Sequence, residues 1–258
     1  MNDQYESPLH IYRNSFNIIN IIKTSYRYTK GFKLTIWKIA ITWGVIFFIL
    51  YKFTGLFLPD TERLILLDTE MYAEQLKQNM MIFGFVSTPI FAPLTTGVIM
   101  TIISYLRDEY VSYKSIFKYY SNIWILSLAS LIVHSINKIV FFFINTIGDY
   151  LHLAWTTVLA YALSAIVGIM YIFTLPLIVD KELKIWEAME LSRKAVFSHF
   201  FSIVILYLLL SIILVISAIP LGIGIIWTVP MFLIAFYGLP YRTIFDGVCY
   251  DGEEKIVT

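Results

Sequence analysis

A stretch of 42 residues, from Phe200 to Tyr241, contains no charged side chain. A helix of that length would measure about 63 Å, roughly twice the thickness of the hydrocarbon core of a bilayer. The stretch IPLGIG at 219–224 places one proline and two glycines near the middle of the run, and these residues break helices. The run therefore predicts two membrane-spanning helices joined by a tight turn.

The composition of the whole chain agrees with a membrane protein. Apolar residues make up 59% of the 258 residues and charged residues 14%, against about 45–50% and about 25% in a soluble domain. A water-soluble fold of this size could not bury so much apolar surface. The chain is predicted to be an all-α integral membrane protein.

Four more spans follow from the same reasoning. Met80–Leu106 and Leu153–Val179 are uncharged runs of 27 residues each, and Lys118 and Lys138 bracket another apolar interval. The shorter run Ile39–Tyr51 can reach span length because its flanking lysines extend their ammonium groups toward water. Six spans are predicted, near 37–58, 80–106, 120–146, 152–179, 200–219 and 225–245.

The distribution of basic residues predicts the orientation. With the N-terminus inside, the inner segments hold 15 of the 19 Lys and Arg residues, and the outer side keeps only Lys52, Arg63, Lys77 and Lys138. Cytoplasmic loops carry such an excess of cations. We therefore expect both termini to be cytoplasmic, with an interfacial helical arm at 1–35, a membrane domain at 36–247 and a tail at 248–258.

The segments that precede the odd-numbered spans resemble one another. Each begins at a serine (Ser25, Ser115 and Ser192), continues with cationic and aromatic residues, has Gly or Ser at the seventh position and then becomes apolar. This pattern predicts three repeats of an interfacial helix followed by a helical hairpin.

The segment before the fifth span has helical periodicity at about 183–197. Met189, Ser192 and neighbours at the same spacing share one face, and charged residues share the opposite face. One interpretation is a solvated cytoplasmic helix. The other is a helix lying in the headgroup layer, in which Trp186, Arg193 and Lys194 contact lipids.

A resemblance rests on the C-terminal third. LPLIVDKELKIWEAMELSRKAVFSHF, IPLGIGIIWTVPMF and YRTIF, within about 175–247, resemble uncharacterised bacterial inner-membrane proteins with six spans. That group is distantly similar to the membrane domain of some glycerophosphodiester phosphodiesterases. The resemblance implies a multi-pass protein of the bacterial inner membrane, and it implies no catalytic residue.

The sequence contains no pattern typical of an enzyme, such as Gly-x-Ser-x-Gly, His-Glu-x-x-His or a phosphate-binding glycine loop. The four histidines fall on both predicted sides of the membrane, so we expect no metal and no cofactor. The net charge of +1 does not favour nucleic acid as a partner. We predict that the protein is not an enzyme.

The even-numbered spans are rich in proline and glycine. Each proline removes one backbone hydrogen bond, so neighbouring helices must satisfy the carbonyls that are freed. The glycines predict close contact between helices at four positions, Gly84, Gly97, Gly168 and Gly238.

One polar cluster falls inside the predicted spans. His134, Asn137 and Lys138 share a helix face, and Asp149 and His152 begin the return span. Ionisable residues within a span are costly and often mark functional sites. The alternative is that Lys138 extends to the outer headgroups while His134 and Asn137 bond a neighbouring helix.

These observations favour a non-catalytic scaffold or accessory membrane subunit with membrane lipids as partners. The alternative is a transporter or lipid-handling protein with a cavity between the kinked even-numbered spans. Partner membrane proteins and a second copy of the chain are both left open.

Overall fold

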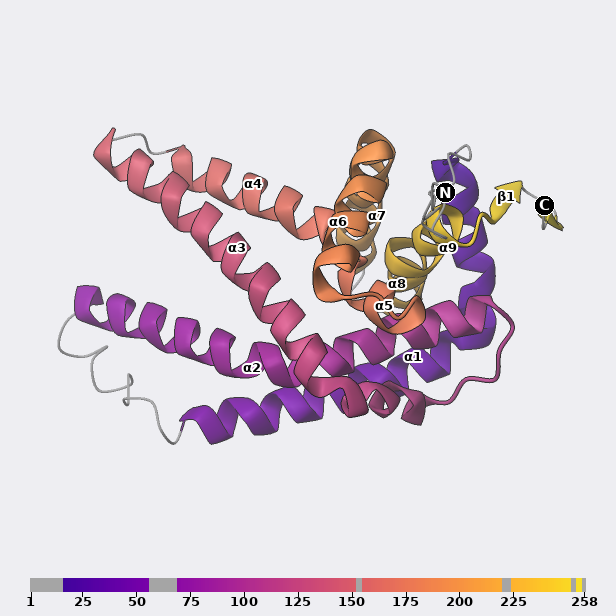
Figure 1. Cartoon of the computed structure of the whole chain (residues 1–258), viewed down its shortest axis with the longest axis horizontal. Coiled ribbons are helices and arrows are strands. Elements are labelled where there is room, and N and C mark those ends of the chain that lie inside the picture. Colours follow the sequence, from indigo (N-terminus) through magenta and orange to yellow (C-terminus); the bar gives the residue numbers. More distant parts are fainter. Residues whose placement is uncertain (1–15, 56–68, 152–154, 220–223, 252–253, 257–258) are drawn as a thin grey trace, which may run out of the picture. The chain divides into compact units, whose positions relative to one another are not determined.

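A computed structural model describes residues 16–55, 69–151, 155–219, 224–251 and 254–256 (Figure 1). The regular elements of this part of the chain are helices, apart from a short antiparallel pair of strands near the C-terminus in which Tyr250 pairs with Lys255. The elements are α1 (Ile18–Gly55), α2 (Thr69–Leu106), the 3₁₀ helix η1 (Tyr113–Asn122), α3 (Ile123–Tyr150), α4 (Thr156–Met170), α5 (Thr174–Asp180), α6 (Ile185–Ser198), α7 (Phe200–Ala218), α8 (Ile225–Leu233), the π-helix η2 (Ile234–Gly238), α9 (Leu239–Phe245), β1 (Cys249–Asp251) and β2 (Glu254–Ile256).

Six helical stretches in the described residues are long and apolar enough to cross a membrane, which is the number of spans that the sequence predicts. They are Ile18–Phe53, Glu74–Leu106, Tyr113–Gly148, Thr156–Asp180, Phe200–Ala218 and Ile225–Phe245. The chain is thus compatible with a multi-pass membrane protein. α2 begins at Thr69 rather than near residue 80, because the polar segment before the predicted span continues the same helix.

The described residues form two compact units. The first unit contains the residues up to Trp37, Ile99–Tyr113 and the residues from Ile169 onward, and the second contains Lys38–Val98 and Lys114–Gly168. α1 and α2 therefore each contribute to both units. The predicted boundary between the arm at 1–35 and the membrane domain falls inside α1, close to the unit boundary at Trp37.

In the first unit, the N-terminal half of α1 buries one face. Ile21, Ser25, Phe32 and Ile36 follow one another at intervals of four or seven residues and are almost fully buried, as expected for one stripe of an amphipathic helix. Phe32 stacks on Tyr105 with ring centroids 4.1 Å apart. This half of α1 is therefore anchored to the last turn of α2.

The second unit has its own core. Ile39, Phe91, Leu94 and Ile116 are buried together, and Trp43 packs on Phe91 with centroids 4.7 Å apart. α3 and α4 form an antiparallel hairpin, as Figure 1 shows, and Phe141 contacts Tyr161 across it at 4.9 Å.

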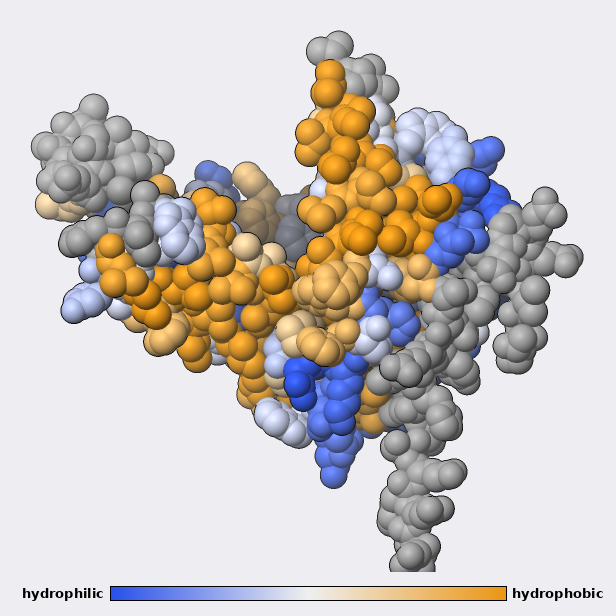
Figure 2. All heavy atoms as spheres, turned by 90° about the horizontal axis from the view of Figure 1, so that it is seen from above, coloured by the Kyte–Doolittle hydropathy of each residue, from blue (hydrophilic) through white to orange (hydrophobic). Residues whose placement is uncertain are grey.

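Large apolar side chains remain exposed along the spans, and Figure 2 shows many of them in orange. The side chains of Phe142, Val158, Leu208 and Val215 are all more than half exposed. Contiguous apolar surface of this extent is unfavourable in water. It agrees with helices that are solvated by lipid.

Candidate functional site

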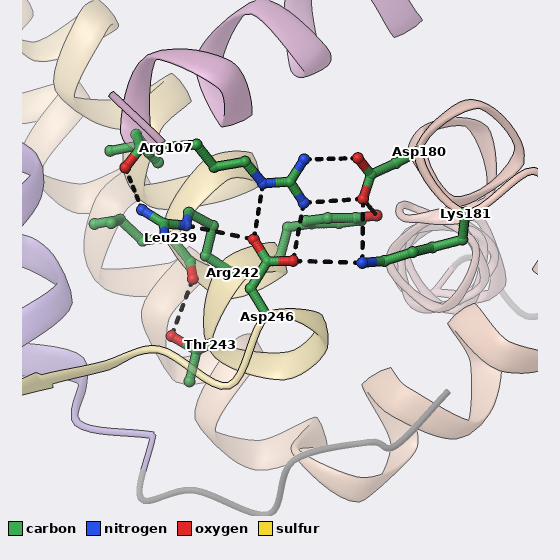
Figure 3. A network of polar contacts seen from close by, with 9 residues as sticks. Arg107, Asp180, Lys181, Leu239, Arg242, Thr243 and Asp246 are labelled. Atoms are coloured by element: carbon green, nitrogen blue, oxygen red, sulfur yellow. Dashed lines mark hydrogen bonds and ion pairs between the residues drawn. The ribbon is translucent and has the colours of Figure 1, made fainter. Parts of the chain in front are cut away.

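The candidate site is a network of charges where the ends of three helices of the first unit meet (Figure 3). Arg107 follows the end of α2, Asp180 is the last residue of α5, and Asp246 follows the end of α9. These three residues come directly after positions 106, 179 and 245, where the even-numbered spans were predicted to end. The charged residues that directly follow the three even-numbered spans thus contact one another.

Arg107 forms four hydrogen bonds to the two carboxylates. Nη1 and Nη2 donate to Oδ1 and Oδ2 of Asp180 at 2.6 and 2.9 Å. Nε and Nη2 donate to Oδ2 and Oδ1 of Asp246 at 3.0 and 2.9 Å. The planar guanidinium fork suits such paired recognition, whereas the single ammonium group of lysine does not.

Three further side chains complete the network. Tyr241 donates its hydroxyl to Oδ2 of Asp180 at 2.7 Å. Lys181 places Nζ 3.5 Å from Asp180 and 3.6 Å from Asp246. Arg242 donates from Nη1 to the carbonyl of Leu106 and places Nε 3.4 Å from Asp246. Three cations therefore surround two carboxylates.

The network has a helix-terminus component as well. Helix C-termini carry partial negative charge and leave carbonyls without helical partners. Arg107, Lys181 and Arg242 each lie at the C-terminal end of one helix, and Arg242 bonds the last carbonyl of α2. The three cations thus stabilise three converging helix ends.

The electrostatics keep Arg107 charged. Its hydrogen bond to Asp180 is the largest cause that raises its pKa above the usual value. Burial opposes this increase, and the hydrogen bond to Asp246 adds to it. Both carboxylates of the network are bound by Arg107, so neither is left over for proton transfer. We interpret the network as a structural clamp. Within the described ranges, no group of three or more His, Cys, Asp or Glu residues could hold a metal ion.

All three helices end in the same backbone conformation. Among the described residues, those with positive φ are Asp108, Glu182 and Gly247, and each lies two positions beyond the end of α2, α5 or α9. A left-handed residue just past a helix end is a common stop signal. After α2, Glu109 N–H donates to the carbonyl of Ser104 at 3.0 Å, which closes the terminus.

The fourth span is broken just before the network. α4 ends at Met170 and α5 begins at Thr174, and such a break leaves backbone groups without helical partners. The hydroxyl of Ser192 donates to the carbonyl of Met170 at 2.9 Å and accepts from the N–H of Phe173 at 3.2 Å. Ser192 is fully buried on α6, so this helix holds the break in place.

Neighbouring side chains satisfy the carbonyls that three prolines leave free, as the sequence predicts. Pro93, Pro230 and Pro240 cannot donate to the residue four positions earlier. Ser127 donates to the carbonyl of Pro89 at 2.8 Å, Trp37 to that of Ile226 at 3.1 Å and Tyr207 to that of Phe236 at 3.2 Å. Each of these three proline-containing segments is thereby tied to another helix.

The glycine prediction holds at some positions and not at others. A Cβ at Gly97 would lie 2.1 Å from the carbonyl oxygen of Ile116, and one at Gly238 would lie 2.6 Å from the side chain of Leu106. A Cβ at Gly84 would make an ordinary contact, at 3.9 Å from His134. Around Gly168 nothing lies within 4 Å, so the prediction of close contact is wrong there.

The structure describes only part of the polar cluster that was predicted in the third span. Asn137 donates to the carbonyl of Val133 within its own helix at 3.1 Å, and Lys138 is exposed. His134 packs edge-on against Phe85 with centroids 5.4 Å apart, and its Nε2 is buried without a hydrogen bond. The side chain of Asp149 and the whole of His152 lie outside the described residues.

The predicted amphipathic helix exists as α6, and only His199 separates it from α7. Its apolar face, which includes Met189 and Val196, is buried through packing with α5 and α7. Trp186, Arg193 and Lys194 lie on the exposed face. Lys194 pairs with Glu190 at 2.7 Å, and this hydrogen bond lowers the pKa of Glu190.

Sequence reasoning did not assemble the network around Arg107. One available signal was that a charged residue directly follows each even-numbered span. No protein-family model matches this chain, and no curated protein or solved structure matches it either.

Proposed function

We propose that the chain is a non-catalytic multi-pass protein of the bacterial inner membrane that serves as a scaffold or accessory subunit. The observation that carries this proposal is the network around Arg107, in which the charged side chains at three helix ends bind one another. The charged groups of this network are occupied by one another and not by a substrate. Here Asp180 and Asp246 are both held by one arginine.

The proposal includes three hairpins of related structure. It is supported by the shared stop signal after α2, α5 and α9 and by the charged residue at each of those ends. Ser25 and Ser192, which align in two of the repeats, are both fully buried. Ser115 is only partly buried, so the second repeat differs from the other two at this position.

The proposal also places both termini in the cytoplasm, on the basis of the distribution of Lys and Arg. Reporter fusions after Gln75 and after Lys184 test this topology. Gln75 lies before the second span, and Lys184 lies before α6. The two reporters should locate to opposite sides of the membrane. Location on the same side would contradict the topology.

A distance measurement tests the scaffold role. Spin labels are attached at Glu109→Cys and Glu182→Cys, two exposed positions beyond α2 and α5, in a protein that also carries Cys249→Ser. The distance between the two labels reports on the network. In lipid bilayers a scaffold should give one narrow distance distribution. The same pair of labels in a protein with Asp180→Asn should give a broader distance distribution. This variant is the positive control for separation of the helix ends.

The second candidate function is a transporter or lipid-handling protein. The break between α4 and α5 and the π-helix η2 in the sixth span favour it, since discontinuous helices often form transport sites and π-helices often occur at functional sites. Two distance populations in the unmutated network would support this candidate and would overturn the scaffold.

A further inference from the structure

The exposed surface of α6 is divided into two stripes of different chemistry. The first stripe consists of Trp186, Arg193 and Phe197, which are seven and four residues apart and project within about 40° of one another on a helix. Trp186 and Phe197 are each 73% exposed. We call these three residues the aromatic stripe.

The second stripe is polar. It consists of Glu187, Glu190 and Lys194, which project within about 60° of one another. Lys194 pairs with Glu190 at 2.7 Å, and the side chains of both are about half exposed. This polar stripe points away from the buried face that packs with α5 and α7, and the aromatic stripe lies to one side of it. α6 therefore has a protein-facing, an apolar and a hydrophilic surface.

The charges of α6 determine how the helix can lie in a bilayer. They extend from Lys184 at the N-cap to Lys194 near the last turn, and it is costly to carry such groups through hydrocarbon. Four residues link α5 to α6, and only His199 separates α6 from α7. Each end of α6 is thus held close to the end of a span, and the helix lies along one surface of the bilayer.

The aromatic stripe is continuous with the lipid-facing surface of α7. Phe201 is 79% exposed and lies four residues after Phe197, beyond the junction between the two helices. Leu208 and Ile212 follow on α7 and are more than half exposed. α7 is apolar enough to span a membrane, so acyl chains surround these side chains. The lipid that covers α7 therefore reaches the aromatic stripe.

We infer that α6 lies in the headgroup layer, with its aromatic stripe toward the acyl chains and its polar stripe toward water. Trp186 suits this boundary because its ring is apolar and its N–H can donate to a headgroup. The stem of Arg193 lies along acyl chains while its guanidinium reaches the lipid phosphates. The inference goes beyond the scaffold role, because it holds whether or not the network around Arg107 separates.

Depth measurements on single nitroxide labels test the inference. The full chain with Cys249→Ser is placed in vesicles of phosphatidylethanolamine and phosphatidylglycerol, without other proteins. One matched pair of labels is Trp186→Cys and Glu187→Cys, and the other is Phe197→Cys and Lys194→Cys. All four positions are exposed, so the labels leave the packed face of α6 intact. Relaxation by oxygen, which concentrates in lipid, and by a water-soluble nickel chelate gives the depth of each label.

The two members of each pair should lie at different depths. The labels on the aromatic stripe should lie about 5–10 Å below the lipid phosphates, and the labels on the polar stripe should lie level with the phosphates or in water. Equal access of the chelate to both members of a pair would overturn the inference. One aromatic label in lipid and the other in water would also overturn it, because α6 would then cross the interface.

Two other occupants of the aromatic stripe would give different results. If a partner protein covers the stripe, both aromatic labels should be in water, because the vesicles contain only this chain. If a second copy of the chain covers it, the label at Phe197→Cys should show dipolar broadening by its counterpart and little relaxation by oxygen. Either result would overturn the lipid surface.

A double variant tests whether the two aromatic rings hold α6 at this depth. A label at Arg193→Cys should lie below the phosphates, and Trp186→Ser with Phe197→Ser should move it toward water. The control, Glu187→Ser with Lys194→Ser, changes two exposed side chains on the polar stripe without altering the net charge, and it should leave the label where it was. The same label depth in both double variants would contradict the role of the aromatic stripe.

Discussion

The hydroxyl of Tyr207 donates to the carbonyl of Phe236 at 3.2 Å, and the rings of the two residues stack with centroids 3.9 Å apart. Phe236 is four residues before Pro240, which has no N–H to donate. Tyr207 therefore replaces a helical hydrogen bond that the sequence of the sixth span excludes.

Removal of the Tyr207 hydroxyl should destabilise the protein. Tyr207→Phe leaves the carbonyl of Phe236 without its side-chain donor, which costs about 1–3 kcal/mol. In a Pro240→Ala background the new N–H can supply the bond, so Tyr207→Phe should cost less than about 0.5 kcal/mol. Reversible unfolding in detergent measures both values, and equal costs in the two backgrounds would refute the role of Tyr207.

Disruption of the network around Arg107 should be more costly. Arg107→Lys keeps the charge but loses the fork that bonds Asp180 and Asp246, and Asp180→Asn leaves Arg107 undercompensated. We expect a loss of about 2–4 kcal/mol for each, measured by thermal unfolding. The control Glu190→Gln breaks an exposed pair with Lys194 and should have an effect of less than about 0.5 kcal/mol. Similar small effects in all three variants would show that the network does not stabilise the helix ends.

Ser192→Ala should destabilise the break in the fourth span. It leaves the carbonyl of Met170 and the N–H of Phe173 without their side-chain partner, at a cost of about 2 kcal/mol. Hydrogen exchange should also become faster at residues 171–174. Ser198→Ala is the matched control, because the hydroxyl of Ser198 bonds only within or next to its own helix. Equal exchange in the two variants would contradict the role of Ser192.

Substitution of two glycines should have opposite effects. At Gly97 a Cβ would overlap the backbone of Ile116, so Gly97→Ala should lower the free energy of unfolding by at least about 2 kcal/mol. At Gly168 there is open space, so Gly168→Ala should raise it by up to about 1 kcal/mol, because alanine favours helix more than glycine does. Thermal unfolding measures both, and a tolerated Gly97→Ala would exclude close contact at η1.

The sequence by itself determined the elements that depend on local composition. Uncharged runs predicted six spans because a helix in lipid must be apolar along its length, and the periodicity at 183–197 predicted α6. The prolines predicted that carbonyls would need outside donors. The sequence predicted a helical arm before the first span, but it did not predict that the described part of this arm and the span form one uninterrupted helix, α1. A helix that is exposed on one face carries cations without being interrupted.

Only the tertiary structure decided which side chains meet. Arg107 and Asp246 are 139 positions apart, and Trp37 and Ile226 are 189 apart, so no local pattern connects them. The periodicity of its segment placed Ser192 on the same helix face as Met189, yet its hydroxyl bonds both sides of a helix break. Hydropathy reports the environment of each residue singly, whereas a hydrogen bond or an ion pair depends on which two helices are neighbours. That choice is made by packing and is absent from any single stretch of sequence.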